Sequence, residues 1–154
     1  MMARILTLRA NASGTATIEL GLFAPILAAM LVGLIDLSTA YSDKLHLEQV
    51  SQRIVERVQQ TTFKPSMEEA IEDEAEAAAG TGSVAEVTWW LECDGEKMTG
   101  TTAYTDGCDD DETYARYVQL DIEKNYTPII PAQYVGAGSG GVVELHGVAG
   151  VRIQ

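Results

Sequence analysis

The chain has 154 residues, and its 23 acidic and 10 basic side chains give it a formal net charge of −13. An acidic surface repels nucleic acid, because nucleic-acid binding depends on basic contacts to phosphate, and it disfavours lying flat on anionic lipid. The length is sufficient for one membrane segment and one small domain of roughly a hundred residues.

An uncharged apolar stretch runs from Leu20 to Ile35 near the N-terminus. As a helix it would cover about 24 Å, and the residues on either side make it long enough for a hydrocarbon core of about 30 Å. Arg4 and Arg9 precede the stretch, whereas acidic residues follow it. The positive-inside rule therefore predicts a cytoplasmic N-terminus and an exported remainder.

Three other interpretations compete for this stretch. A cleaved secretory signal could end at the small residues Ser38 to Ala40, which would release a secreted acidic binding module. An uncleaved single-pass anchor would have no further function. A buried core helix of a soluble protein is disfavoured by the continuous hydrophobicity and by the basic residues at the extreme N-terminus.

Glu19 stands at the entrance of the apolar stretch, where a carboxylate is costly and is usually retained for a partner. Cleavage after Gly14 would make Thr15 the new N-terminus. The ammonium group of one subunit could then pair with Glu19 of a neighbouring subunit and set the register between them.

Gly14, Glu19 and the apolar run behind them also carry a family resemblance. The segment Gly-Thr-Ala-Thr-Ile-Glu-Leu-Gly-Leu-Phe-Ala-Pro-Ile-Leu, preceded by a basic leader, resembles the TadE-like minor pilins (pseudopilins) of the tight adherence (Tad/Flp) type IV pilus system. The resemblance implies cleavage between Gly14 and Thr15 by a prepilin peptidase, with Glu19 as the glutamate that pairs with a neighbouring N-terminus. It also implies a helix kink at Pro25. The chain departs from the family pattern at Leu20, where Phe or Tyr is common.

The resemblance further implies a structural role in pilus assembly and cell adhesion, without enzymatic activity or cofactors. The protein would be held by a single pass in the bacterial inner membrane, with its C-terminal domain in the periplasm, and it could also reach the pilus or the cell surface. Its expected partners are other pilins and pseudopilins, the prepilin peptidase, the inner-membrane assembly platform and the lipid bilayer.

The helix is expected to continue past the membrane to about Gln60, because no glycine or proline lies between Ile35 and Pro65. One apolar stripe at helical spacing predicts that this extension packs on a small domain or on neighbouring subunits. The stripe consists of Leu47, Val50, Ile54 and Val58.

The domain organisation follows from these segments. We expect a leader peptide (1–14), a transmembrane and assembly helix (15–37), an amphipathic spine helix (38–62) and a periplasmic α+β domain (63–154).

The second predicted helix extends from Met67 to Ala79 after a break that contains Pro65. Ser66 is a candidate N-cap residue, with Glu69 at the capping-box position. The helix is densely acidic, which is typical of a solvated face, with a binding surface as the alternative.

Three later segments alternate between apolar and polar residues, which predicts half-buried antiparallel strands. They are Val84 to Cys93, Ala115 to Asn125 and Val142 to Ile153. Their apolar faces would cover the stripe of the long helix. The expected fold is therefore α+β, with a long N-terminal membrane-spanning helix packed on a small antiparallel sheet, an architecture that is pilin-like.

Cys93 and Cys108 would form a disulfide if the domain is exported to an oxidising compartment, with two free thiols as the alternative. Several carboxylates crowd this loop and are weak candidates for calcium ligands in a metal-dependent adhesin or a membrane-tethered enzyme, although they lack the EF-hand spacing. A solvated acidic loop is the default expectation. The candidate ligands are Asp106, Asp109, Asp110 and Asp111.

No motif for catalysis is found in the sequence. The Gly138-Ser139-Gly140 segment is not a nucleophile elbow, and the glycine-rich stretch around it lacks the lysine of a P-loop. Trp89 and Trp90 are adjacent, so one of them must point outward from a strand. Trp90 is a candidate subunit contact, unless the acidic helix or the cysteine loop covers it.

Overall fold

The structure, a computed structural model, describes residues 15–98, 107–129 and 141–153, and side chains from Ile18 onward. The predicted residues Gly14 and Asp106 and the Gly138–Gly140 segment lie outside the described residues. The elements are α2 (Thr15–Gln60), η2 (Pro65–Met67), α3 (Glu68–Ala79), β1 (Ser83–Cys93), β2 (Glu96–Lys97), β3 (Tyr114–Tyr126) and β4 (Val143–Arg152).

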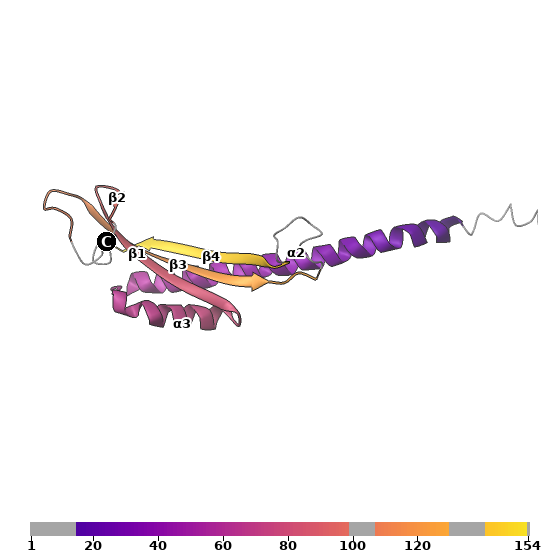
Figure 1. Ribbon diagram of the computed structural model, residues 1–154, viewed down its shortest axis with the longest axis horizontal. Helices are drawn as coiled ribbons and strands as arrows, with labels where there is room; N and C mark the ends of the chain where they lie inside the picture. The colour runs from indigo at the N-terminus through magenta and orange to yellow at the C-terminus, as the bar shows by residue number, and fades with distance from the viewer. Residues whose placement is uncertain (1–14, 99–106, 130–140, 154) are drawn as a thin grey trace, which may run out of the picture.

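The helix α2 is the spine of the molecule. Its 46 residues would measure about 69 Å at 1.5 Å per residue. Figure 1 shows that its N-terminal half projects beyond the rest of the described chain, whereas its C-terminal half lies along the sheet. The predicted continuation of the membrane helix to Gln60 is therefore confirmed.

The sheet has four antiparallel strands in the order β2-β1-β3-β4. The three long strands coincide with the three predicted segments to within a residue or two at their ends. The short strand β2 was not predicted, although Asp94 and Gly95 signal it. Both residues have positive φ values, 50° and 86°, which matches the two-residue Asp-Gly turn favoured in hairpins.

The core lies between α2 and one face of the sheet. The predicted helix stripe is buried, with exposed fractions of 4 % or less for all four side chains. They pack against the inward-facing side chains of the strands, which are Ala85, Val87, Val118, Leu120, Ile122 and Leu145. The predicted α+β fold, with the helix packed on the sheet, is confirmed.

One glycine allows α2 to approach β4 closely. A Cβ atom added to Gly147 would lie 2.6 Å from the Cβ atom of Leu47. Leu47 itself is fully buried. A side chain at position 147 would therefore push the helix away from the strand.

The start of α3 differs from the prediction. The N-cap residue is Met67, no side chain caps the helix, and Ser66 lies inside the 3₁₀ turn η2. The reason is Pro65, whose restricted φ angle suits the first position of a helical turn. The Met67 N–H donates to the carbonyl of Lys64 at 2.9 Å, so the chain already turns before α3 begins.

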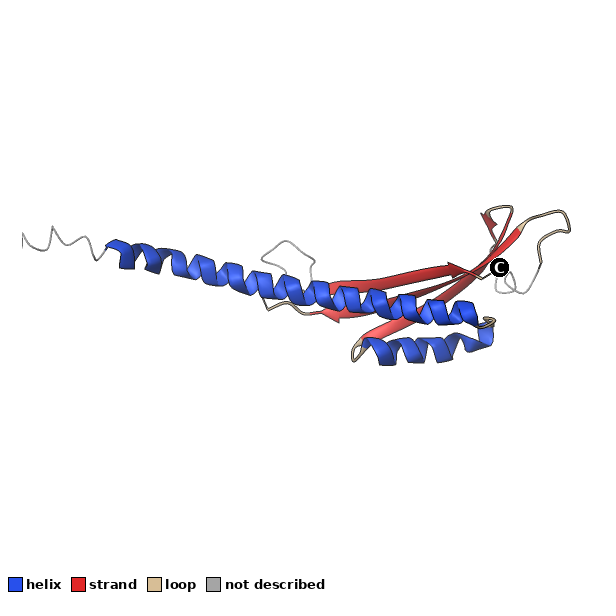
Figure 2. Ribbon diagram, turned by 180° about the vertical axis from the view of Figure 1, so that it is seen from behind, coloured by secondary structure: helices blue, strands red, loops and turns tan. Residues whose placement is uncertain are grey.

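The acidic helix α3 packs beside β1, as Figure 2 shows, and buries Ile71, Ala75 and Ala79. Two of its carboxylates accept hydrogen bonds from the β1 backbone. The Val87 N–H donates to Glu72 Oε1 at 2.9 Å, and the Ala85 N–H donates to Glu76 Oε1 at 3.1 Å. The prediction of a merely solvated acidic face is therefore wrong for these two residues.

A disulfide joins Cys93 to Cys108, with 5.6 Å between their Cα atoms. It ties the end of β1 to the segment that leads into β3. For a loop of 15 residues, chain entropy gives a stabilisation of about 3 kcal/mol.

Candidate functional site

The N-terminal part of α2 is apolar on all sides and lies free of the domain. Large side chains from Ile18 to Leu37 are more than half exposed, which is far above what a soluble protein normally tolerates over one continuous surface. By length and composition this helix could cross a membrane. The exposed apolar side chains are Ile18, Leu20, Leu22, Phe23, Ile26, Leu27, Met30, Leu31, Leu34, Ile35 and Leu37.

The exposure pattern separates this segment from a core helix. A helix that docks on one partner has an apolar stripe and a polar opposite face, as α2 has farther along. Between Leu20 and Ile35, no charged or hydroxyl side chain interrupts the apolar surface. A surrounding apolar medium, or a ring of similar helices, is the environment in which such a surface is stable.

Glu19 lies exposed at the beginning of this apolar segment. No ion pair within the described part of the chain includes it. Thr15, the residue that follows the expected cleavage site, is the first residue of α2, four residues before Glu19. The two residues are thus placed at one end of a single helix.

Pro25 lies inside α2, which is assigned as one helix from Thr15 to Gln60. Because proline has no N–H group, the carbonyl four residues earlier, at Gly21, lacks its usual helical donor. A Cβ atom built on Gly21 would meet no atom within 4 Å. A neighbouring helix could therefore approach this point closely.

Asp36, which ends the apolar segment, is 8 % exposed and joins α2 to the domain. Its Oδ1 atom accepts hydrogen bonds from the Tyr126 hydroxyl at 2.7 Å and from the Ile129 N–H at 2.9 Å. The hydrogen bond to the carboxylate, together with burial, raises the pKa of Tyr126 above its usual value. A second tie, the ion pair between Lys124 and Asp43, lies nearby at 3.6 Å.

In the sequence, Asp36 stands only as the first acidic residue after the apolar stretch. The one feature of the sequence that could have indicated this role is a single carboxylate in the middle of a long helix, on the same side of the helix as the buried residue Leu47. Its partners lie 90 and 93 residues away in the sequence. No local pattern links residues at that separation.

Trp90 lies on the outer face of the sheet. Its ring stacks on Tyr117 with 5.3 Å between centroids, and the Lys97 Nζ atom lies 4.3 Å from its centroid. Trp89 points inward and packs against Phe63. The buried residues of α3 belong to the core on the inner face of the sheet, opposite to Trp90, and part of the cysteine loop lies outside the described residues.

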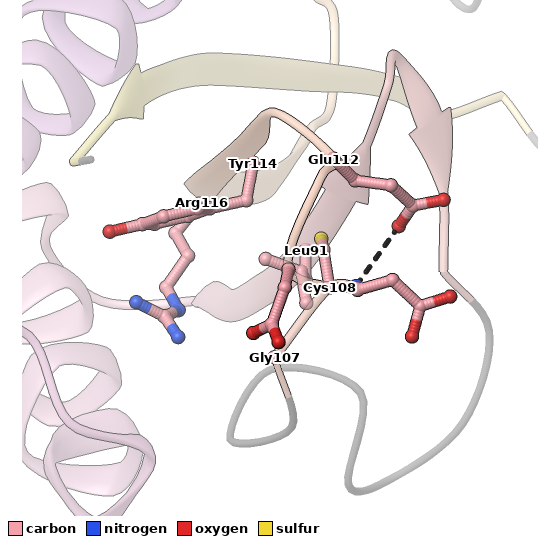
Figure 3. A pocket seen from close by; sticks show the side chains of 8 residues that line it. Leu91, Gly107, Cys108, Glu112, Tyr114 and Arg116 are labelled. Atoms are coloured by element: carbon pink, nitrogen blue, oxygen red, sulfur yellow. Dashed lines mark hydrogen bonds between the residues drawn. The ribbon is translucent and has the colours of Figure 1, made fainter.

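A shallow cavity of about 370 Å³ lies beside the disulfide, and Figure 3 shows its lining. The Asp109 N–H donates to a carboxylate oxygen of Glu112, the dashed contact in that figure. Arg116 and Tyr114 line the side formed by β3.

The metal hypothesis gains no support from this cavity. Among the described residues, the one group of potential ligands that lie close enough together is Cys93, Cys108 and Glu112. The two sulfurs are bonded to each other, so Glu112 would be the single remaining ligand. The described candidates Asp109, Asp110 and Asp111 belong to no such group.

The family model described as TadE-like protein matches residues 14–55. The matched range begins at Gly14 and covers the exposed apolar segment, Asp36 and most of the helix stripe. Over this part of the chain it confirms the resemblance to TadE-like proteins seen in the sequence. No curated protein and no solved structure matches the chain.

Proposed function

We propose that this protein is a minor pilin or pseudopilin that takes part in assembling a tight adherence-type pilus through its N-terminal hydrophobic helix. The observation that carries the proposal is the construction of α2. Its first half is apolar on all sides and exposed, and it continues without interruption into a second half that is buried in the protein's own domain.

This construction suits a subunit that is stored in a membrane and then transferred to a helical bundle. The exposed half of α2 would be solvated by lipid in the bacterial inner membrane and by other pilin helices in the assembly, since both surroundings are apolar. The sheet and α3 would remain in the periplasm. The pilus assembly platform would act on the membrane-embedded half.

Glu19 would set the axial alignment of each subunit relative to its neighbour in this assembly. After prepilin peptidase cleaves between Gly14 and Thr15, the new ammonium group can pair with Glu19 of a neighbouring pilin. Removing one partner of a buried ion pair typically destabilises by about 3–5 kcal/mol, because the other charge is left without compensation. A mismatched register would leave both charges in an apolar environment.

The first test is the N-terminal residue of the mature protein, purified from its native membrane and identified by mass spectrometry. We expect Thr15. An N-terminus at Tyr41 would indicate an ordinary exported domain, and an intact Met1 or Met2 would indicate an unprocessed anchor, so either result would contradict the proposal.

The second test is Glu19→Ala, with Glu56→Ala as the matched control on the exposed surface of the same helix. We expect Glu19→Ala to be cleaved largely as before but to reduce the number of pili at least about tenfold, since a loss of only about 1.4 kcal/mol already weakens each subunit contact about tenfold. Glu56→Ala should leave piliation unchanged. Normal piliation in Glu19→Ala, measured by electron microscopy of intact cells, would contradict the assigned role.

A secreted or membrane-anchored acidic binding module is the alternative. Release after Ala40 would cut α2 in the middle and remove Asp36, whose carboxylate binds the Tyr126 hydroxyl and the Ile129 N–H. This argues against a signal that ends at Ala40. An anchored module unrelated to pili would insert in the membrane normally, but its deletion would leave piliation intact.

A further inference from the structure

We propose that the turn after β3 contacts the lipid interface through Ile129, so that the domain touches the membrane at a second point beside α2. The inference rests on the proposed function only in requiring that α2 spans a membrane. The partner is a lipid surface with no net charge.

The position of Ile129 is set by Asp36. The Ile129 N–H donates to Asp36 Oδ1 at 2.9 Å, and Tyr126, at the end of β3, donates to the same oxygen. Figure 1 shows that β3 and the short connection after it extend farther along α2 toward its N-terminus than the strand β1 or the helix α3. Among the described parts of the domain, this turn and the start of β4, where Val143 pairs with Tyr126, therefore lie nearest to the exposed apolar segment.

The exposed apolar segment of α2 ends at the same position along the helix axis as the turn after β3. From Ile18 to Ile35 the helix rises about 27 Å, which is close to the roughly 30 Å of a hydrocarbon core. With this segment in the bilayer, Asp36 lies at the boundary of the hydrocarbon. Because the Ile129 N–H is hydrogen-bonded to Asp36 Oδ1, the Ile129 side chain lies near that boundary as well.

The chemistry of the turn fits an interface. The Ile129 side chain is 67 % exposed, although its backbone is held in place by a buried carboxylate. Tyr41 is also exposed, about one and a half turns beyond Asp36 on α2, and tyrosine is enriched at membrane interfaces. Lys124 on β3 is paired with Asp43 and Lys44 on α2 is paired with Glu48, so little free positive charge is available for anionic headgroups.

Two attachment points would restrict the tilt of the domain on the membrane. The helix alone permits the domain to rock and rotate over the bilayer surface, whereas an apolar side chain inserted beside it favours one orientation. Subunits waiting for assembly would then present the same side of the sheet to their neighbours.

The test places a tryptophan at the turn in the full-length protein, reconstituted in phosphatidylcholine vesicles. Ile129→Trp is compared with Val148→Trp, an exposed valine of β4 that pairs with Asp121, five residues or about 17 Å along β3 from Tyr126. The emission of the unaltered protein, from Trp89 and Trp90, serves as background. The quenchers are a lipid brominated near the headgroup and aqueous iodide.

We expect the added emission of Ile129→Trp to be blue-shifted, quenched by the brominated lipid and protected from iodide. Val148→Trp should show the opposite pattern. Quenching of position 129 by iodide alone would overturn the inference, and so would protection from both quenchers, which would indicate a protein contact instead.

Flotation with the vesicles distinguishes a failure of this inference from a failure of the proposed function. Flotation of the protein with the vesicles, resistant to alkaline extraction, reports insertion of α2 independently of position 129. A protein that floats but exposes position 129 to iodide would overturn only the contact at the turn. A protein that does not float would overturn both proposals.

Discussion

The carboxylate of Asp36 is where the exposed half of α2 is attached to the folded domain. A buried carboxylate is tolerated only when hydrogen bonds replace its lost hydration. Here the Tyr126 hydroxyl and the Ile129 N–H provide those bonds, at 2.7 and 2.9 Å. Asp36 thus restricts the direction in which the helix leaves the domain.

We predict that Asp36→Ala lowers the free energy of unfolding of the detergent-solubilised chain by about 1–3 kcal/mol, because the partly buried Ile129 N–H loses its acceptor and the Tyr126 hydroxyl keeps only the backbone carbonyl of residue 36, at 3.2 Å. Tyr126→Phe removes the hydroxyl but leaves the Ile129 N–H bonded to Asp36, so it should cost less. The double variant should be less destabilised than the sum of the two, since the residues are in contact. Urea titration followed by tryptophan fluorescence measures all three, and strict additivity would contradict the coupling.

The pH dependence of stability provides a separate prediction for Tyr126. Its pKa is raised in the folded state, chiefly by the hydrogen bond to Asp36, so above the ordinary value of 10.0 the folded state keeps a proton that the unfolded state has lost. Stability from this residue is therefore complete below about pH 10 and declines as the pH rises through the folded-state pKa.

Tyr126→Phe should accordingly flatten part of the decline in stability above pH 10. Urea midpoints measured at several alkaline pH values test this. Equal slopes for the variant and the unaltered protein would show that other groups cause the decline.

At the scale of elements, α3 protects an otherwise open edge of the sheet. Beyond its short pairing with β2, the outer edge of β1 has no neighbouring strand in the described sheet. Unpaired strand edges invite pairing with other chains. The carboxylates of Glu72 and Glu76 occupy two of the free N–H groups on this edge, at Val87 and Ala85.

We predict that Glu72→Ala combined with Glu76→Ala lowers the free energy of unfolding by about 2–4 kcal/mol, because hydrogen bonds to charged groups contribute roughly 1.5–3 kcal/mol each and these are partly exposed. The double variant should also aggregate at lower concentration. Glu69→Ala combined with Asp73→Ala is the control, since it removes the same charge from exposed positions of the same helix.

Urea titration and light scattering distinguish the two pairs. Equal behaviour of both double variants would mean that only the net charge of α3 matters. It would contradict a specific role of the two carboxylates at the strand edge.

At the scale of the whole molecule, the folded unit includes more of α2 than its apolar stripe. The domain uses Asp36, eleven residues before Leu47, the first residue of that stripe. A helix that is shared between membrane and domain couples the two mechanically, because no flexible linker separates them.

We predict that a soluble fragment of residues 34–154 is more stable than a fragment of residues 41–154 by about 1–3 kcal/mol, since only the longer fragment keeps the Asp36 hydrogen bonds. The fragment 34–154 carrying Asp36→Ala should match the shorter one. Urea midpoints of the three fragments provide the comparison. If the altered long fragment is as stable as the unaltered one, the extra helical turns, and not Asp36, are responsible.

The sequence by itself determined the features that depend on local periodicity. The length of α2 follows from the absence of glycine and proline between Ile35 and Pro65. Its stripe from Leu47 to Val58 and the three long strands follow from spacings of three to four or of two residues, which each segment carries within itself. The resemblance at Gly14 and Glu19 is likewise local, and the family match begins at the same place. The strand β2 could have been predicted from its Asp-Gly turn.

Only the tertiary structure decided where the carboxylates act. In the sequence, Asp36 resembles a charge at a membrane interface, and Glu72 and Glu76 resemble part of a solvated acidic helix face. Their roles depend on backbone and hydroxyl groups of two strands and of the turn after β3, which lie 9 to 93 residues away. A carboxylate accepts a hydrogen bond from any donor brought near it, so its partner is set by chain packing and not by its own neighbours in the sequence.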